Sequence, residues 1–166
     1  MAASSFLIPV RWTWDVCRNR TPTPPAPQRT IADQLACEAG FFSIGTNELI
    51  QYTMAADRNN TRVAPIANPF QPAVLRLVRQ VVEAGRLAGI EVALCGELAA
   101  DPLATPLLLG LGLEELSVSA QLIPRLKRAI SFCSFAEAGR IAQQALHMST
   151  SAAVRGLLAD AHRQVD

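Results

Sequence analysis

Three short apolar segments, each followed by polar residues and a helical pattern, constrain the fold of this chain most. They are FFSIGT (41–46), IEVALC (90–95) and ELSVSA (115–120). A strand and then a helix, repeated along a chain, predict parallel βα units. In parallel α/β folds, ligands bind at the carboxyl ends of the strands. In this chain the polar residues cluster at those ends. Those residues are Thr46, Asn47 and Glu48 after the first strand, Cys95 and Glu97 after the second, and Ser117 and Ser119 in the third.

Helical spacing and end signals predict the helices that surround these strands. One helix occupies residues 31–40 and stops at Gly40. A longer helix begins near Pro72, which suits a first-turn position, and ends at Gly89. Its apolar stripe consists of Val74, Leu75, Val78, Val81 and Val82.

Four more helices are predicted in the C-terminal part of the chain. A short helix follows the second strand, with Asp101 as its cap and Pro102 in its first turn. The others are 122–132, 135–147 after a capping box of Ser134 and Glu137, and 151–163 after Thr150 or Ser151.

The first thirty residues differ in composition from the rest of the chain. They hold both tryptophans, four arginines, one acidic residue and the run PTPPAP. This proline spacing favours extended or disordered chain over packed structure. We therefore expect an unrelated N-terminal segment at residues 1–30 and an α/β domain at residues 31–166.

Composition indicates a globular protein of ordinary charge. The chain has 166 residues, of which 50% are hydrophobic, and this is enough for one core. A net charge of +1 gives no electrostatic case for binding nucleic acid or an anionic membrane. No apolar run approaches the roughly 20 residues that span a bilayer. The four cysteines are too far apart for a CxxC metal pair or a disulfide framework, so we expect a cytoplasmic protein.

The residues after the first predicted strand offer oxygen ligands and a guanidinium. Asn47 and Glu48 present an amide and a carboxylate, which suit a phosphate oxygen and a hard cation such as Mg²⁺. Arg58, in the following loop, can bind a phosphate through two hydrogen bonds. Structural roles remain open for both positions. Asn47 also fits a helix cap, and Arg58 also fits a surface ion pair with Asp57 or Glu48.

Cys95 stands where the second predicted strand ends. On the residues alone its thiol fits a small buried hydrophobe, a metal ligand, half of a disulfide or an acid in a reaction. Glu97 follows two positions later, beyond Gly96, and a carboxylate at a strand end seldom serves packing. This neighbour favours a chemical role without excluding a place in the core.

Several motifs together resemble one family of enzymes. They are FFSIGTNELIQYTMAADRNN, NPFQPAVLRL, CGELAADPLATPLLLGLGLEELSVSA and IPRLKR. In order and spacing they resemble the C-terminal part of the phosphoenolpyruvate (PEP)-binding domain of the enzyme I family, the PEP-dependent phosphotransferases of the bacterial sugar phosphotransferase system. Pyruvate phosphate dikinase and PEP synthase share some of these elements, but QYT, the DRNN loop and LLLGLGLEELSVS are more similar to enzyme I. The resemblance runs from Ile31 to the C-terminus.

This resemblance implies a fold and a mechanism. The fold would be a (β/α)₈ barrel, of which this chain holds the last three βα units, so that the barrel is incomplete. Asn47 and Arg58 would hold the phosphoryl group of PEP, and Glu48 would help to coordinate Mg²⁺. Cys95 would protonate C3 of enolpyruvate while the phosphoryl group leaves for a histidine on another domain. Supporting positions would be Thr46, Gly96 and Glu97.

The resemblance also implies partners. PEP or pyruvate would be the small-molecule ligand, and a histidine phosphocarrier protein would be reached through a histidine domain that has no counterpart here. The family's barrel carries a dimer contact, so a homodimer is expected.

The chain departs from the family pattern in two ways. Glu48 stands where the family has Asp, Gln71 where it has His, and Ala100 where it has Gly. In addition, the first five barrel strands and the histidine domain have no counterpart, and residues 1–30 do not resemble the family. We therefore expect a truncated chain that is inactive alone. The alternatives are a non-catalytic dimerisation or regulatory module and a sensor that binds PEP or pyruvate.

Overall fold

A small parallel sheet lies at the centre of the protein. The computed structural model describes residues 31–57 and 59–163, in which the strands are β1 (Phe41–Gly45), β2 (Glu91–Cys95) and β3 (Glu115–Ser117). Strand β2 lies between the other two, and both strand pairs are parallel. The predicted α/β class with parallel strands is confirmed.

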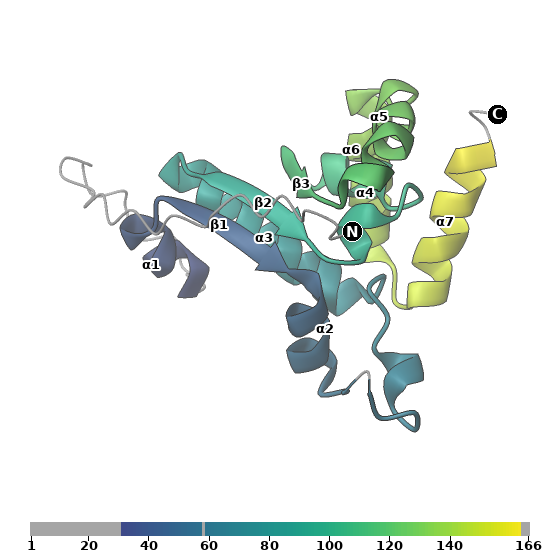
Figure 1. Ribbon diagram of the computed structural model, residues 1–166, viewed down its shortest axis with the longest axis horizontal. Coiled ribbons are helices and arrows are strands. Elements are labelled where there is room, and N and C mark those ends of the chain that lie inside the picture. Colours follow the sequence, from purple (N-terminus) through teal and green to yellow (C-terminus); the bar gives the residue numbers. More distant parts are fainter. Residues whose placement is uncertain (1–30, 58, 164–166) are drawn as a thin grey trace, which may run out of the picture.

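One helix packs behind the sheet, and most of the others lie to one side of it. Figure 1 shows α3 behind the strands, α1 beyond one end of β1, and α4 to α7 gathered on the side of β3. The α-helices of the described residues are α1 (Ile31–Glu38), α2 (Thr46–Met54), α3 (Pro72–Ala88), α4 (Thr105–Gly110), α5 (Ile123–Ser131), α6 (Phe135–His147) and α7 (Ser151–Arg163). Short 3₁₀ turns lie at Ala64–Ile66, Leu98–Ala100 and Ala120–Leu122.

The sheet has one apolar face, which packs on α3. Val92 and Leu94 of β2 join the same buried cluster as Val78 and Val82 of α3. The stripe predicted for this helix is therefore confirmed, with Val81 packed against the edge of the cluster. Gly89 ends the helix as predicted, because its φ of 68° is a left-handed conformation that glycine adopts without strain.

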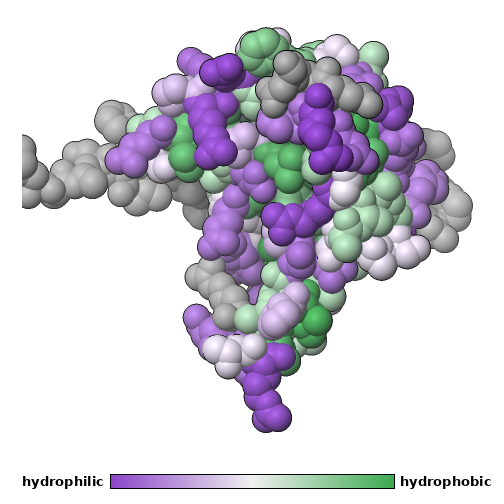
Figure 2. Space-filling model, turned by 90° about the vertical axis from the view of Figure 1, so that its right-hand side faces the viewer, coloured by the Kyte–Doolittle hydropathy of each residue, from purple (hydrophilic) through white to green (hydrophobic). Residues whose placement is uncertain are grey.

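Beyond Phe41 at its beginning, the opposite face of the sheet carries small and polar side chains. Ser43, Glu91, Glu115 and Ser117 are exposed. Parallel sheets are usually buried on both faces. The side of the molecule on which the C-terminal helices lie, seen in Figure 2, shows hydrophilic residues with hydrophobic areas between them.

The C-terminal helices belong to the same core as the sheet. Helix α4 approaches α6 so closely that a Cβ at Gly110 would lie 1.9 Å from the carbonyl oxygen of Ala138. The Arg76 side chain of α3 donates hydrogen bonds to the carbonyl oxygens of Leu146 (3.1 Å) and Met148 (3.4 Å), at the corner between α6 and α7. This corner is therefore fixed to the first turns of α3.

The predicted cap residues are confirmed at two helices, but the Glu137 carboxylate of the predicted capping box pairs with Arg140. The backbone N–H of Glu137 donates to Ser134 Oγ at the start of α6, at 3.2 Å. At the start of α7 the N–H of Ala153 donates to Thr150 Oγ1, also at 3.2 Å. Of the two candidates for the second cap, the hydroxyl that binds is therefore that of Thr150.

Two predictions about helices are wrong. The helix expected to open at Asp101 and Pro102 begins instead at Thr105. The Asp101 carboxylate accepts a hydrogen bond from the N–H of Leu103 (2.9 Å), which forms a turn before the helix. The other error is an omission, because the segment NELIQYT lies within α2.

Some predictions fall outside the described residues. They concern residues 1–30 and Arg58. Within the described part of the chain, no helix combines the length and the apolar character needed to cross a membrane.

Candidate site at the carboxyl ends of the strands

The register of the sheet aligns three residues at the carboxyl ends of the strands. Gly45 pairs with Cys95, and Cys95 pairs with Ser117. Because paired residues of neighbouring strands face the same side of a sheet, the Cys95 thiol lies on the face with small and polar side chains, between a glycine and a serine. The thiol is half-buried.

Two weak hydrogen bonds orient the Cys95 thiol. Its Sγ donates to the carbonyl oxygen of Ile44 at 3.4 Å, and the Ser43 hydroxyl donates to Sγ at 3.9 Å. Cys37, Cys95 and Cys133 are free thiols. Cys95 is therefore neither in a disulfide nor fully buried in the core, and these two alternatives from the sequence do not hold.

The first turn of α2 follows β1 without a loop. Gly45 is the residue before the helix, so Thr46, Asn47 and Glu48 all lie in its first turn. Capping therefore does not account for Asn47. An acidic residue in this turn interacts favourably with the positive end of the helix dipole, which suits Glu48.

Thr46 connects the end of β2 to the start of α2. Its side chain is 0% exposed, and its hydroxyl donates a hydrogen bond of 2.9 Å to the carbonyl oxygen of Cys95. Gly96, which follows Cys95, has a φ of +104°, and a Cβ at this glycine would lie 2.4 Å from Thr46 Oγ1. Both positions thus hold the backbone beside the thiol, and neither offers a reacting group to the site.

The Glu48 carboxylate lies over the end of β1. A Cβ at Gly45 would stand 2.7 Å from Glu48 Oε2. The lack of a side chain at Gly45 therefore leaves the space that the carboxylate occupies. Glu48 is itself exposed, so its oxygens are accessible to an ion or ligand in solution.

A small pocket of about 70 Å³ lies beside these residues. It brings Asn47 together with Glu97, as expected from their positions after neighbouring strands, but its lining includes neither Cys95 nor Glu48. Ala67 and Pro69, from the segment before α3, also line the pocket, and the sequence did not indicate them. The lining residues are Asn47, Ile50, Gln51, Ala56, Ala67, Pro69, Glu97 and Leu98.

The oxygen ligands at the strand ends suit Mg²⁺ only in part. The described residues contain no group of three or more His, Cys, Asp and Glu side chains that could hold a metal ion. Glu48 supplies one carboxylate, and Mg²⁺ is often held by one or two carboxylates together with phosphate oxygens of a substrate. The residues present therefore fit a Mg²⁺ site in which Glu48 supplies one ligand and the phosphate of a bound substrate supplies others. They do not fit a Mg²⁺ site made by the described side chains alone.

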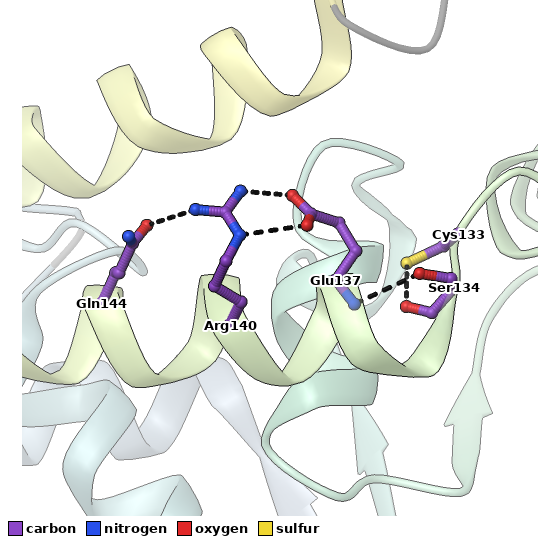
Figure 3. Close-up of polar contacts among 5 residues, drawn as sticks. All are labelled: Cys133, Ser134, Glu137, Arg140 and Gln144. Atoms are coloured by element: carbon purple, nitrogen blue, oxygen red, sulfur yellow. Dashed lines mark hydrogen bonds and ion pairs between the residues drawn. The ribbon is translucent and has the colours of Figure 1, made fainter.

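Among the described residues, α3, α6 and α7 each carry ion pairs between neighbouring turns. Figure 3 shows Arg140 between Glu137 and Gln144 on α6. The hydrogen bond from Arg140 lowers the pKa of the Glu137 carboxyl. Burial raises the pKa of the Cys133 thiol, and the nearby Glu137 charge adds to the effect. Cys133, which joins α5 to α6, is therefore disfavoured as a thiolate nucleophile.

The fold and the strand-end residues define a parallel α/β protein with its polar groups at the carboxyl edge of the sheet. A family model described as "PEP-utilising enzyme, PEP-binding domain" matches residues 26–134. This chain belongs to that family of PEP-utilising enzymes, and the resemblance noted from its motifs is confirmed.

Relatives from several bacteria carry the name phosphoenolpyruvate-protein phosphotransferase. The chain is 53% identical over 121 residues to the phosphoenolpyruvate-protein phosphotransferase of Bacillus subtilis (strain 168). The matched segment covers 73% of this chain and 21% of the relative. It is 48% identical over 128 residues to the protein of the same name from Staphylococcus carnosus (strain TM300), covering 77% and 22%. The match to the Buchnera aphidicola protein of that name is 45% identical over 128 residues, again covering 77% and 22%. The chain thus spans about a fifth of the length of the relatives it matches.

Proposed function

We propose that this chain forms the C-terminal part of the PEP site of a PEP-dependent protein-histidine phosphotransferase. The observation that supports this most is the position of Cys95. Its thiol lies at the carboxyl end of the central strand, and the Thr46 hydroxyl ties the Cys95 backbone to the turn that bears Asn47 and Glu48. The relatives' name, phosphoenolpyruvate-protein phosphotransferase, supplies the reaction.

In the proposed reaction, Cys95 is the acid. As the bond between phosphorus and the enol oxygen breaks, the phosphoryl group passes to a histidine nitrogen. The Cys95 thiol gives its proton to C3, and the product is pyruvate. Reactions of this kind depend mostly on positioning and on neutralising charge. A thiol that is partly exposed and oriented by neighbouring groups suits proton delivery to a bound enolate.

The other residues of the proposed site bind the phosphoryl group. The Asn47 amide donates to a phosphoryl oxygen, and Arg58 pairs with the same group through its guanidinium. Glu48 is the carboxylate that this chain contributes to a Mg²⁺ site. When bound, the ion neutralises negative charge on the phosphoryl oxygens. Thr46, Gly96 and Glu97 support the site.

The wider architecture belongs to the same proposal. Residues 31–166 would be the last three βα units of a (β/α)₈ barrel, and residues 1–30 a separate segment. The expected partners are a histidine phosphocarrier protein and a second copy of the barrel, in the cytoplasm. The exposed polar face of the sheet supports this arrangement, because a barrel interior would enclose it.

A phosphoryl-transfer assay tests whether the chain acts alone. The purified chain is incubated with PEP, Mg²⁺ and a histidine phosphocarrier protein, and labelled phosphate on the carrier is measured. We expect transfer no higher than the blank, because an open sheet leaves most of the phosphate site unformed. Transfer above the blank would contradict the proposed incompetence.

A chimera tests the role of Cys95. The matched segment of the Bacillus subtilis relative is replaced by the corresponding residues of this chain, and phosphoryl transfer is measured. We expect the chimera to be active and its Cys95→Ala form to lose at least about 10²-fold in rate. The matched control is Cys133→Ala, which should keep full activity. If the Cys95→Ala chimera were as active as the unsubstituted chimera, the proposed role of Cys95 would be wrong.

One observation also favours a regulatory module. In the described residues β1 and β3 are edge strands, and unpaired edges are templates for another chain. A sizing column run with and without the full-length relative separates this alternative, because a regulatory module elutes with the full-length protein. A sensor is distinguished by calorimetric titration with PEP or pyruvate.

A further inference from the structure

The C-terminal helix contacts the segment that walls the pocket. Arg155, in the second turn of α7, places its guanidinium carbon 5.3 Å from the centre of the Phe70 ring. In Figure 1 the start of α7 lies near the segment that leads into α3. Phe70 is only 2% exposed, whereas Arg155 is exposed. The guanidinium therefore covers the outer side of a ring that is otherwise within the core.

Phe70 is continuous with the wall of the pocket. Its N–H donates to Asn68 Oδ1 at 2.9 Å, and the N–H of Gln71 donates to the Asn68 carbonyl oxygen at 3.1 Å. These bonds close a turn around Pro69, which lines the pocket together with Ala67. Displacement of the Phe70 ring would therefore be transmitted to Pro69 and Ala67 in the pocket lining.

Helix α7 is itself held firmly enough to act as a support. Val154 and Leu158 are buried in the main core at 0% and 2% exposure. The preceding corner is fixed to α3 through the Arg76 side chain, which binds the carbonyl oxygens of Leu146 and Met148. Arg155 thus reaches Phe70 from a helix that is anchored on both its inner face and its N-terminal side.

We propose that Arg155 is a positioning residue for the pocket beside Asn47 and Glu97. Its cation–π contact holds Phe70, and through the turn at Asn68 it holds residues 67–69 at the distance that sets the width of the pocket. Helix α7, which contributes no residue to the pocket lining, thereby controls how well a ligand fits there. The pocket joins the proposed PEP site through Asn47. The inference therefore rests on the proposed function for the identity of the ligand, PEP, but not for the contact between Arg155 and Phe70.

Hydrogen exchange tests the contact between Arg155 and Phe70 in the 166-residue chain. Backbone amide exchange is measured in the parent, Arg155→Gln, Arg155→Lys and Arg163→Gln proteins. We expect Arg155→Gln to exchange about three-fold faster at Asn68, Phe70 and Gln71, because a cation–π contact is weak but local. Arg155→Lys keeps the cation and should restore most of the protection.

The controls separate a local effect from general loss of stability. Arg163 lies on the same helix and pairs with Asp160, so Arg163→Gln should leave exchange at residues 68–71 unchanged. Amides of β2 should exchange equally in all four proteins. Unchanged exchange at residues 68–71 in Arg155→Gln overturns the proposal. Equal acceleration in β2 does so too, since it shows a structural role alone.

A titration with PEP and Mg²⁺ tests the effect on the pocket. If the parent chain binds PEP, Arg155→Gln should bind about three-fold more weakly, and Arg155→Lys should recover most of the affinity. Equal binding by Arg155→Gln overturns the claim that this contact sets the pocket. If the parent chain does not bind PEP, the proposal that this chain alone binds PEP is wrong. The amide exchange still decides whether Arg155 holds residues 67–69.

Discussion

Gly96 has a backbone conformation that other residues adopt only with strain. Its φ is +104°, and the missing Cβ leaves room for the Thr46 hydroxyl, which would otherwise be 2.4 Å away. The sequence indicated only that Gly96 separates a thiol from a carboxylate. A positive φ is a property of the folded backbone, so the reason for glycine at this position becomes visible only in the structure.

Substitution of Gly96 by alanine should destabilise the protein. Strain at a positive φ costs about 1–3 kcal/mol, and the contact with Thr46 adds to it. The measurement is the free energy of unfolding in urea. The matched control is Gly139→Ala in the interior of α6, where an added Cβ meets nothing within 4 Å. That change should stabilise by about 0.5–1 kcal/mol, and equal effects of the two substitutions would contradict this account.

The Thr46 hydroxyl gives a second prediction at the residue scale. Thr46→Val keeps the shape of the side chain but removes the hydrogen bond to the Cys95 carbonyl oxygen. We expect a loss of about 1–2 kcal/mol in unfolding free energy. Thr46→Ser keeps the hydroxyl and should preserve the bond. If Thr46→Ser were the less stable of the two, the lost methyl group would matter more than the bond.

Among the elements, long helices with a clear stripe were predictable and short ones were not. Helix α3 has both a stripe and a glycine stop, and it was predicted to within one residue at each end. The start of α4 was not, because Asp101–Pro102 and Thr105–Pro106 both have the form of a cap followed by proline. Helix α2 was missed because its first turn holds polar residues that face the strand ends, so its apolar periodicity is weak.

The contact between α4 and α6 depends on one glycine. Gly110→Ala would place a methyl group 1.9 Å from the Ala138 carbonyl oxygen, and backbone atoms cannot yield easily. We expect a loss of about 1–3 kcal/mol, the range for overpacked sites. Thermal or urea unfolding measures it, with Gly156→Ala in α7 as a control at an unobstructed position. An unaffected Gly110→Ala protein would mean that α4 and α6 can separate freely.

Acid should weaken the stabilisation of α6 by its ion pair. Arg140 depresses the pKa of Glu137 in the folded protein below its ordinary value of 4.5. A depressed carboxyl pKa contributes stability above the unfolded value, and this is lost as the pH falls through the folded value. The stability difference between the parent and Arg140→Gln should therefore shrink below pH 4.5. It should be small, since both side chains are substantially exposed. A difference that grows in acid would contradict this.

For the molecule as a whole, the order of the strands along the chain indicated a parallel sheet, and the structure confirms it. The polar positions after the strands were also predictable, because carboxyl ends of parallel strands share one edge. The pocket wall was not, since residues 67–69 come from a segment with no periodic pattern. Closure into a barrel remains a prediction, because the described residues provide three strands.

This arrangement predicts an order of local stability. Strand β2 is hydrogen-bonded on both sides and its middle residues are buried. Helix α1 has eight residues and packs mainly on α3. We expect amides of β2 to exchange most slowly and those of α1 to exchange much faster, because local openings cost less where few contacts are lost. Mass spectrometry of peptic fragments measures both, and equal protection would show that α1 opens only with the whole molecule.

The space above Gly45 makes the position of the Glu48 carboxylate adjustable. Gly45 has an ordinary extended backbone, with φ of −78° and ψ of 102°, so alanine fits there without strain. The added methyl group would meet only the end of a flexible side chain and would turn the carboxylate aside. Gly45→Ala is thus a way to shift a charge by a small distance while its number, its chemistry and the fold stay the same. Binding of cations of different radius to the parent and to Gly45→Ala would then test whether the position of this carboxylate matters to the proposed Mg²⁺ site.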